Sequence, residues 1–309
     1  VVSQFDMKDV EAVGLVKFDF LGLTTLTILD WTLRYIKRLD PASTLALEAI
    51  PLDDADAYRI FAQAKTTAVF QFESRGMRDL LKQARPDRFE DIIALVALYR
   101  PGPMDLIPDF IARKHGKPFD YPDPRVKSVL SETYGIMVYQ EQVMQMAQLV
   151  GDYSLGGADL LRRAMGKKNA EEMAQQRGIF REGAAKSGLH EAKADELFDL
   201  MEKFAGYGFN KSHAAAYALV AYQTAYFKAH HAAAFMAANL SAAADDTDKV
   251  KQFYEDARAS GLTVLPPDIN RGEYRFVPLD TQTISYGLGS IKGTGESAIA
   301  AIVAAREGK

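Results

Sequence analysis

The longest apolar stretch of the chain covers residues 214–227, where, apart from the tyrosine hydroxyls, only Gln223 and Thr224 are polar. A helix that is apolar on every side is buried among other elements, so this stretch predicts a central buried helix. At about 1.5 Å per residue it spans on the order of 20 Å, which is too short to cross a membrane. We expect the rest of the fold to pack around it.

The N-terminal end of this expected helix carries polar and cationic residues. Asn210 or Ser212 can cap the first free N–H groups, and Lys211 and His213 stand beside them as potential cations. Free N–H groups and cations together make a seat for a phosphate. The alternative is that Lys211 is a solvated side chain and His213 a hydrogen-bonded core residue.

Apolar residues recur at helical spacing through most of the remaining chain. This spacing predicts helices over residues 24–39, 89–99, 136–150, 170–186, 191–204, 232–244 and 245–260. Strand-like patterns are fewer and shorter, and they cover residues 11–23, 66–72, 274–277 and 283–286. We therefore expect a mainly α fold with a strand near the N-terminus and a small hairpin near the C-terminus.

Composition narrows the class of protein. The 309 residues are 48% hydrophobic and 25% charged, which is ordinary for a soluble globular protein. No apolar run reaches membrane-spanning length, and the absence of cysteine excludes disulfides and thiolate metal sites and suits the cytoplasm. The net charge of −4 means that any binding to nucleic acid must come from local basic patches. Because the chain lacks a start methionine, we expect it to be part of a longer protein.

One basic patch lies in the stretch 153–168. Arg162, Arg163, Lys167 and Lys168 are four cations within seven residues that contain no acid, a pattern that suits a polyphosphate. The alternative is structural, because Asp159 can pair with Arg163 one helical turn away. Cations are also favoured near a helix C-terminus without any ligand. The residues alone leave both interpretations open.

Two further segments could contact nucleic acid. Arg75, Arg78, Lys82 and Arg85 follow one another closely, and the last three fall on one helix face. A row of basic residues on a helix is usually only a solvated face. Residues 288–305 are similar to a helix–hairpin–helix element, whose Gly-x-Gly turn offers backbone N–H groups to DNA phosphates. The likeness is partial, because Thr294 replaces the usual aliphatic residue and Ile299 a small one.

Asp19 is the candidate catalytic carboxylate. It lies between two phenylalanines in the apolar run 11–23, and burying a carboxylate there is costly unless it is paired or bound to a metal. The alternative is an aspartate on an edge strand that faces solvent.

Six motifs together resemble the α subunit of bacterial DNA polymerase III, the C-family replicative polymerases. They are GLVKFDFLGL, AVFQFESRGM, IALVALYRPGPM, YQEQVMQMA, LGGADLLRRAMGKK and FAGYGFNKSHAAAYALVAYQT. Their order matches that of the family over essentially the whole chain. The resemblance implies the end of the palm over residues 1–23, a helical fingers domain over 24–261 and the start of the helix–hairpin–helix region over 262–309.

The resemblance also implies roles for individual residues. Asp19 matches the third palm carboxylate, which would act beside two Mg²⁺ ions in nucleotidyl transfer. The residues matching the segments that face the incoming dNTP are Arg162, Arg163, Lys167, Lys168, Tyr207, Asn210, Lys211 and His213. Candidate contacts to the DNA primer–template are Arg75, Arg78, Lys82, Lys292, Gly293 and Gly295. Other replicase subunits (sliding clamp, proofreading exonuclease and clamp loader) would bind regions outside this chain.

One departure limits the expected activity. The family carries an Asp-x-Asp pair upstream of the third carboxylate, and Asp6 and Asp9 are not so spaced, so we expect the chain alone to be inactive.

Two other classes remain open. A stand-alone nucleic-acid-binding module would bind duplex DNA regardless of added nucleotide. A helical metal hydrolase using Asp19 with Glu73 or Glu141 would cleave its substrate without any other chain.

Overall fold

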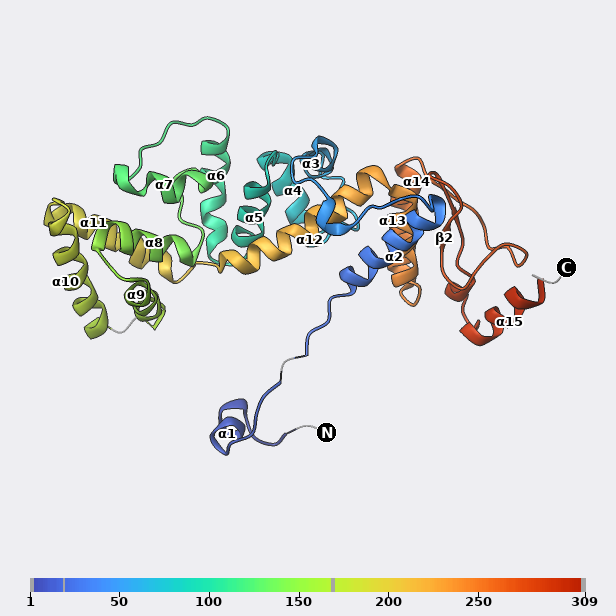
Figure 1. Cartoon of the computed structure of the whole chain (residues 1–309), viewed down its shortest axis with the longest axis horizontal. Helices are drawn as coiled ribbons and strands as arrows, with labels where there is room; N and C mark the ends of the chain where they lie inside the picture. Colours follow the sequence, from blue (N-terminus) through green and yellow to red (C-terminus); the bar gives the residue numbers. More distant parts are fainter. Residues whose placement is uncertain (1–2, 19, 168–169, 307–309) are drawn as a thin grey trace.

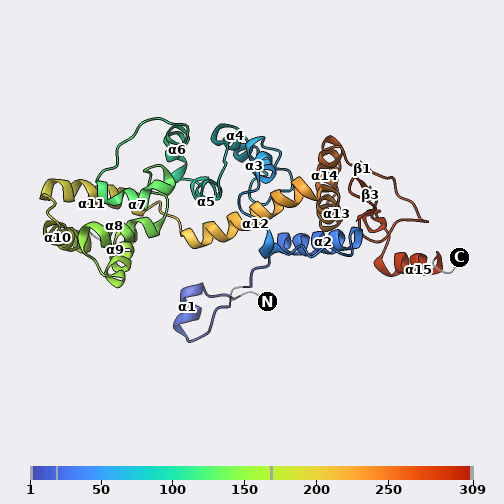
Figure 2. The same ribbon diagram turned by 45° about the horizontal axis from the view of Figure 1, so that its top comes forward.

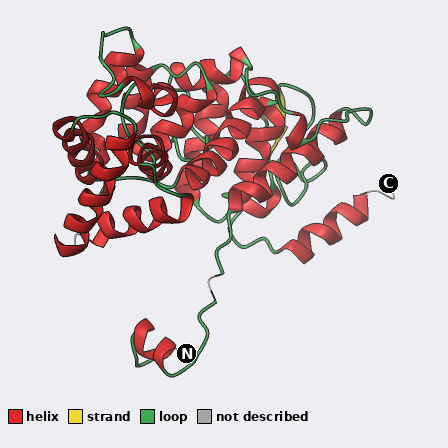
Figure 3. Cartoon of the chain, turned by 60° about the vertical axis from the view of Figure 1, so that its left-hand side comes forward, coloured by secondary structure: helices red, strands yellow, loops and turns green. Residues whose placement is uncertain are grey.

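The computed structural model describes residues 3–18, 20–167 and 170–306. The described chain is mainly helical, as the sequence predicted, and its body is elongated (Figures 1 and 2). This body contains two hydrophobic cores. Helices make up most of it, and loops connect them (Figure 3). None of the described helices is long and apolar enough to cross a membrane.

The first core is built around α12 (Lys211–His230). The other helices around this core are α2 (Thr24–Leu39), α3 (Ala55–Ala62), α4 (Arg75–Ala84), α5 (Phe89–Leu98), α6 (Ile107–Lys114), α13 (Ala232–Ala242) and α14 (Thr247–Ala259). Residues 221–228 of α12 are buried except for the half-buried Tyr226, which confirms the predicted central helix there, whereas Ala216 and Leu219 in the first half of the run 214–227 are exposed. Its buried Thr224 is satisfied, because the hydroxyl donates to the Ala221 carbonyl at 2.7 Å and accepts from the Phe70 N–H at 3.1 Å.

The second core joins five helices that follow one another in the sequence. They are α7 (Lys127–Leu130), α8 (Gln140–Gly151), α9 (Leu155–Lys167), α10 (Ala170–Lys186) and α11 (Glu191–Ala205). Helices α8 and α10 approach so closely that a Cβ at Gly183 would lie 1.8 Å from the Gly151 carbonyl oxygen. Helix α8 begins four residues later than predicted, because the Gln142 side chain accepts from the N–H groups of Val138 and Tyr139 and caps it there.

Two predicted strands are wrong within the described residues. Residues 7–12 form helix α1 (Met7–Ala12), which lies apart from the body, and residues 13–18 and 20–23 form no strand. A strand needs a partner strand for its backbone groups. No strand of the described residues pairs with this segment, whose Phe18 and Phe20 are 73% and 94% exposed. Asp19 itself lies outside the described residues. Residues 66–72 form a turn, because Ala68 and Gln71 adopt positive φ.

The predicted C-terminal hairpin is confirmed. Strand β2 (Val277–Pro278) pairs antiparallel with β3 (Thr283–Ser285), and β1 (Thr263–Val264) adds to β3 in parallel. This sheet packs on the first core through Phe276 and Ile284. The domain limits at residues 23 and 261 stay predictions.

Short 3₁₀ helices complete the described body. They are η1 (Leu47–Ala49), η2 (Pro103–Leu106), η3 (Pro124–Val126), η4 (Ser131–Thr133) and η5 (Leu288–Ser290). After η5 the chain turns into α15 (Glu296–Arg306). The Thr294 hydroxyl donates to the Leu288 carbonyl at 2.8 Å, and Ile299 is 2% exposed, so both unusual residues of this turn have structural roles.

Candidate nucleotide-binding junction

The two cores meet where the N-termini of α8 and α12 lie side by side. In the extended segment before α8, Ile136 and Val138 pack into the first core and Met137 into the second. The Phe209 N–H donates to the Val138 carbonyl at 3.2 Å, and the Gln140 N–H donates to the Phe209 carbonyl at 2.9 Å. We call residues 139–141 together with residues 207–213 the junction. It contains four of the predicted nucleotide-contacting residues.

The N-terminus of α12 receives an anion from this chain. Asn210 caps the helix, because its Oδ1 accepts from the His213 N–H at 2.8 Å. The Glu141 carboxylate accepts from Asn210 Nδ2 at 3.0 Å and from the Lys211 N–H at 2.9 Å. A carboxylate here also complements the positive end of the helix dipole. A glutamate side chain of this chain thus occupies the N–H group of Lys211, and the phosphate seat expected from the sequence stays a prediction.

Lys211 and His213 point in different directions from this helix end. The Lys211 ammonium pairs with both Glu132 carboxylate oxygens at 2.9 and 2.7 Å, and lies 5.4 Å from the centre of the Tyr139 ring. His213 is exposed and stacks on Tyr217 with 4.3 Å between ring centres. The alternative of a core His213 is thus wrong, while the Lys211 side chain is both ion-paired and 37% exposed.

The arginines of α9 share one carboxylate. Arg162 donates from Nε and Nη2 to Asp159 Oδ1 at 3.0 and 2.8 Å, and Arg163 Nε lies 2.8 Å from Asp159 Oδ2. The Arg162 guanidinium, followed by Arg163, keeps the pKa of Asp159 below its ordinary value. The predicted Asp159–Arg163 pair is present, and Arg162 joins it. Lys167 is the last residue of α9, and Lys168 lies outside the described residues.

Gln140 connects the α9 arginines to the junction. Its Oε1 accepts from Arg162 Nη1 at 3.3 Å, and its Nε2 donates to the Gly208 carbonyl at 3.1 Å. The structure therefore brings together two basic segments that are more than forty residues apart in the sequence. The sequence analysis missed Gln140 as a site residue, although the YQEQ motif at the start of α8 marked its position.

Arg100 is a second residue that the sequence analysis missed. It precedes the Pro-Gly-Pro turn, donates to the Tyr207 carbonyl and lies with its guanidinium 4.6 Å from the centre of the Phe209 ring. Burial lowers the pKa of Arg100. Gly102 has φ +100° and a Cβ there would lie 2.7 Å from the Tyr207 ring, so only glycine fits against this tyrosine. The feature of the sequence that could have identified Arg100 is its position directly before the rigid Pro-Gly-Pro turn.

The predicted DNA-contacting residues of α4 lie outside the junction. Arg75 is the first residue of the helix, Arg78 donates to the Thr67 hydroxyl at 3.1 Å, and Lys82 pairs with Asp79 at 3.2 Å. The predicted stripe is shorter than expected, because α4 ends at Ala84 and Arg85 adopts a left-handed conformation that leaves the helix.

The turn of the helix–hairpin–helix-like segment carries the other predicted DNA contacts. Lys292 is exposed there, Gly295 immediately precedes α15, and Gly293 has φ +89°.

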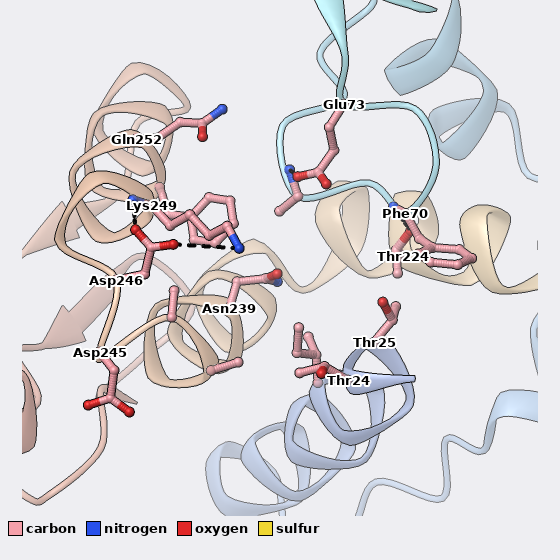
Figure 4. A pocket seen from close by; sticks show the side chains of 15 residues that line it. Thr24, Thr25, Phe70, Glu73, Thr224, Asn239, Asp245, Asp246, Lys249 and Gln252 are labelled. Carbon is pink, nitrogen blue, oxygen red and sulfur yellow. Dashed lines mark hydrogen bonds and ion pairs between the residues drawn. The ribbon is translucent and has the colours of Figure 1, made fainter. Parts of the chain in front are cut away.

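A separate cavity of about 410 Å³ opens beside the start of α2 (Figure 4). Thr24 and Thr25 line it together with Glu73, Asn239 and Lys249. Burial raises the pKa of Glu73, whose carboxylate accepts from the Ala68 N–H at 2.9 Å.

The described residues do not form a metal centre. Among them, no group of three or more His, Asp or Glu side chains is arranged to hold a metal ion. Glu73 and Glu141, named for a metal hydrolase, lie at the cavity and at the junction respectively. Residues 3–18, 20–167 and 170–306 therefore do not make a Mg²⁺ site by themselves.

Comparison with known proteins assigns the family. Residues 25–188 match the bacterial DNA polymerase III alpha subunit finger domain, and residues 261–309 match a helix-hairpin-helix motif. Over 99% of its length the chain is 64% identical to the DNA polymerase III subunit alpha of Xylella fastidiosa (strain Temecula1). Over the same share of its length it is 60% identical to that of Neisseria meningitidis serogroup B and 55% identical to that of Escherichia coli (strain K12). It spans 26–27% of the length of these relatives. The chain belongs to the bacterial DNA polymerase III alpha subunit family.

Proposed function

We propose that this chain binds the incoming dNTP and the primer–template of a DNA-directed DNA polymerase that replicates a bacterial chromosome. The observation that supports this proposal most is that Gln140 is hydrogen-bonded both to Arg162 and to Gly208 in the segment 207–211. A cation of α9 is thereby held close to the segment that leads into the N-terminus of α12. Such an arrangement suits a polyphosphate better than a single charge.

Nucleotide binding in this proposal is an exchange of anions. Arg162 and Arg163 release part of their contact with Asp159, and the dNTP phosphates take over. Arg163 is the more available of the two, with a side chain that is 62% exposed against 28% for Arg162. The arginines neutralise charge that develops on the pyrophosphate as it leaves. Tyr207, which is 47% exposed, lies beside the nascent base pair.

The remaining parts of the reaction lie elsewhere. We assign Mg²⁺ binding to Asp19 together with carboxylates outside this chain. The proposed contacts of Arg162, Arg163 and Tyr207 do not involve the metal. Contacts to the sliding clamp, the proofreading exonuclease and the clamp loader are likewise assigned to other regions of the full-length protein. The turn at Lys292, Gly293 and Gly295 binds the phosphates of duplex DNA. We place this DNA synthesis in the cytoplasm.

Arginine variants test the nucleotide role in a full-length protein that carries this sequence. Charge-assisted hydrogen bonds contribute roughly 1.5–3 kcal/mol each, so Arg162→Ala or Arg163→Ala should weaken dNTP use by about ten- to a hundred-fold. Melting temperatures should stay nearly unchanged, because exposed ion pairs within one helix contribute about 0.3–0.5 kcal/mol.

The matched control is Arg181→Ala, which removes a different ion-paired arginine, held by Asp195 at 2.7 and 2.6 Å. Its incorporation kinetics should resemble wild type. If Arg162→Ala and Arg163→Ala also show wild-type kinetics and only melt earlier, the two arginines serve α9 alone and the proposed function fails.

The isolated 309-residue chain should not extend a primer. Two Mg²⁺ ions about 3.5–4 Å apart need clustered carboxylates, and the described residues do not supply them. Incubation with primed template, the four dNTPs and Mg²⁺ should leave the primer unchanged on a denaturing gel. Extension by protein purified from a polymerase-deficient host would contradict this expectation.

A further inference from the structure

Gln140 contacts both segments to which the proposed function assigns the dNTP. Its side-chain oxygen accepts from Arg162 Nη1 at 3.3 Å, and its side-chain nitrogen donates to the Gly208 carbonyl at 3.1 Å. Its backbone N–H adds a bond to the Phe209 carbonyl at 2.9 Å. A single residue at the start of α8 thus connects α9 with the segment that leads into α12.

The side-chain amide is suited to this connection by its chemistry. An amide offers an acceptor to the guanidinium and a donor to the carbonyl, whereas a carboxylate lacks the donor and an aliphatic side chain lacks both. The close approach also needs a small partner, because a Cβ at Gly208 would lie 3.0 Å from Gln140 Cγ. Both ends of the contact are therefore specific to these residue types.

The two hydrogen bonds of the Gln140 side chain fix Arg162 relative to another helix, which the Asp159 pair cannot do. Asp159 and Arg162 belong to the same helix, so their pairing at 2.8 Å fixes Arg162 only relative to α9. Gln140 belongs to α8 and also holds the segment before α12, so its bond to Arg162 fixes the arginine relative to residues 207–211. The long arginine side chain would otherwise adopt many rotamers.

We propose that Gln140 is a positioning residue, which holds Arg162 in register with residues 207–211 so that both segments contact one dNTP together. This inference rests on the proposed nucleotide role of Arg162. Gln140 contacts the nucleotide only through Arg162 and the Gly208 backbone. Its loss lowers affinity for the dNTP and leaves the chemical step of bound nucleotide little changed.

A double-mutant cycle in the full-length protein tests this role. The variants are Gln140→Leu, Arg162→Ala and their combination, and the control is Gln63→Leu, which changes an exposed glutamine at the end of α3. Steady-state incorporation gives KM and kcat for the dNTP, and thermal melting reports folding. Gln140→Leu should raise KM by about three- to tenfold with a smaller change in kcat. In the Arg162→Ala background the same change should have little further effect.

Each other outcome is informative. A wild-type KM for Gln140→Leu, or the same rise in KM with and without Arg162, overturns the positioning role while leaving the nucleotide role of Arg162 intact. A reduced kcat at unchanged KM also overturns it, because the effect of Gln140 then lies outside dNTP binding. Wild-type kinetics for Arg162→Ala instead refutes the proposed function. If Gln140→Leu does not fold, Gln140→Glu tests the positioning role instead. This variant keeps the acceptor for Arg162 and loses the donor for Gly208, so it should still raise KM.

Discussion

The Glu141 carboxylate accepts a hydrogen bond from the Lys211 backbone N–H at 2.9 Å, so a side chain of α8 caps the N-terminus of α12. The same carboxylate accepts from Asn210 Nδ2 at 3.0 Å. This cap joins an element of the second core to the central helix of the first. The relative position of the two cores at the junction thus depends on a contact between side chain and backbone.

Glu141→Ala should therefore destabilise the chain. Loss of a capping acceptor and of a charged hydrogen bond costs about 1–2 kcal/mol in the free energy of unfolding. Urea denaturation followed by circular dichroism measures this free energy. The control Glu255→Ala removes an exposed glutamate from α14 and should stay within about 0.5 kcal/mol of wild type. Equal stabilities of the two variants would show that the cap contributes nothing.

Asp91→Ala should be more damaging than the loss of the cap. Asp91 is 1% exposed, and it pairs with the buried Lys114 ammonium at 2.8 Å and accepts from the Tyr134 hydroxyl at 2.8 Å. Without Asp91, the buried Lys114 keeps, among the described residues, only the exposed Asp87 as an ion-pair partner, at 2.6 Å. Arg88 and the Tyr134 hydroxyl lose their buried acceptor. Loss of one partner from such a buried network costs about 3–5 kcal/mol. The free energy of unfolding in guanidinium chloride checks this value.

A surface pair that includes Asp109 of α6, the helix of Lys114, provides the control for Asp91. Asp109 pairs with Lys117 at 3.3 Å, and both side chains are more than half exposed. Asp109→Ala should change the free energy of unfolding by less than about 1 kcal/mol. A similar loss in both variants would mean that burial of the Asp91 pair does not matter.

Asp123 should make the stability depend on pH in the acid range. Hydrogen bonds from Arg125, including Nε at 2.8 Å and the backbone N–H at 2.9 Å, hold the pKa of Asp123 below its ordinary value. A carboxyl group whose pKa is lower in the folded state stabilises the fold above its unfolded pKa of about 3.9. This contribution is lost as the pH falls through the folded pKa.

Asp123→Asn should consequently be less stable than wild type at pH 7, and the difference should shrink below about pH 4. Urea denaturation at a series of pH values from 7 to 2.5 measures both curves. The control is Asp79→Asn, at a side chain that is 55% exposed. Parallel curves for wild type and Asp123→Asn over the whole range would refute the assignment.

Local sequence information was sufficient for most helices. The apolar run 214–227 lies within α12, whose second half is largely buried, and the patterns over 170–186 and 191–204 correspond to α10 and α11. Helices satisfy their backbone groups within one segment, so their positions follow from neighbouring residues. The hairpin of β2 and β3 was predictable for the same reason, because its strands are close in the sequence.

Strand patterns were less reliable where the partner was not local. Residues 11–23 carry a strand-like pattern, but the described part of this segment has no neighbouring strand to pair with and forms α1 and extended chain. Residues 66–72 turn back on themselves, since the Thr66 hydroxyl donates to the Phe72 carbonyl at 2.6 Å. Periodicity describes which side chains prefer burial, and it does not supply a partner strand.

The sequence by itself determined which residues could bind phosphate, because cations such as Arg162 and Lys211 are visible as residue types. Only the tertiary structure decided what each of them contacts. Asp159 follows from helical spacing, but Glu132 and Glu141 reach Lys211 from more than sixty residues away. The physical reason is that a buried or half-buried charge takes whichever partner the packing of helices brings within hydrogen-bond distance, and that packing depends on the whole chain.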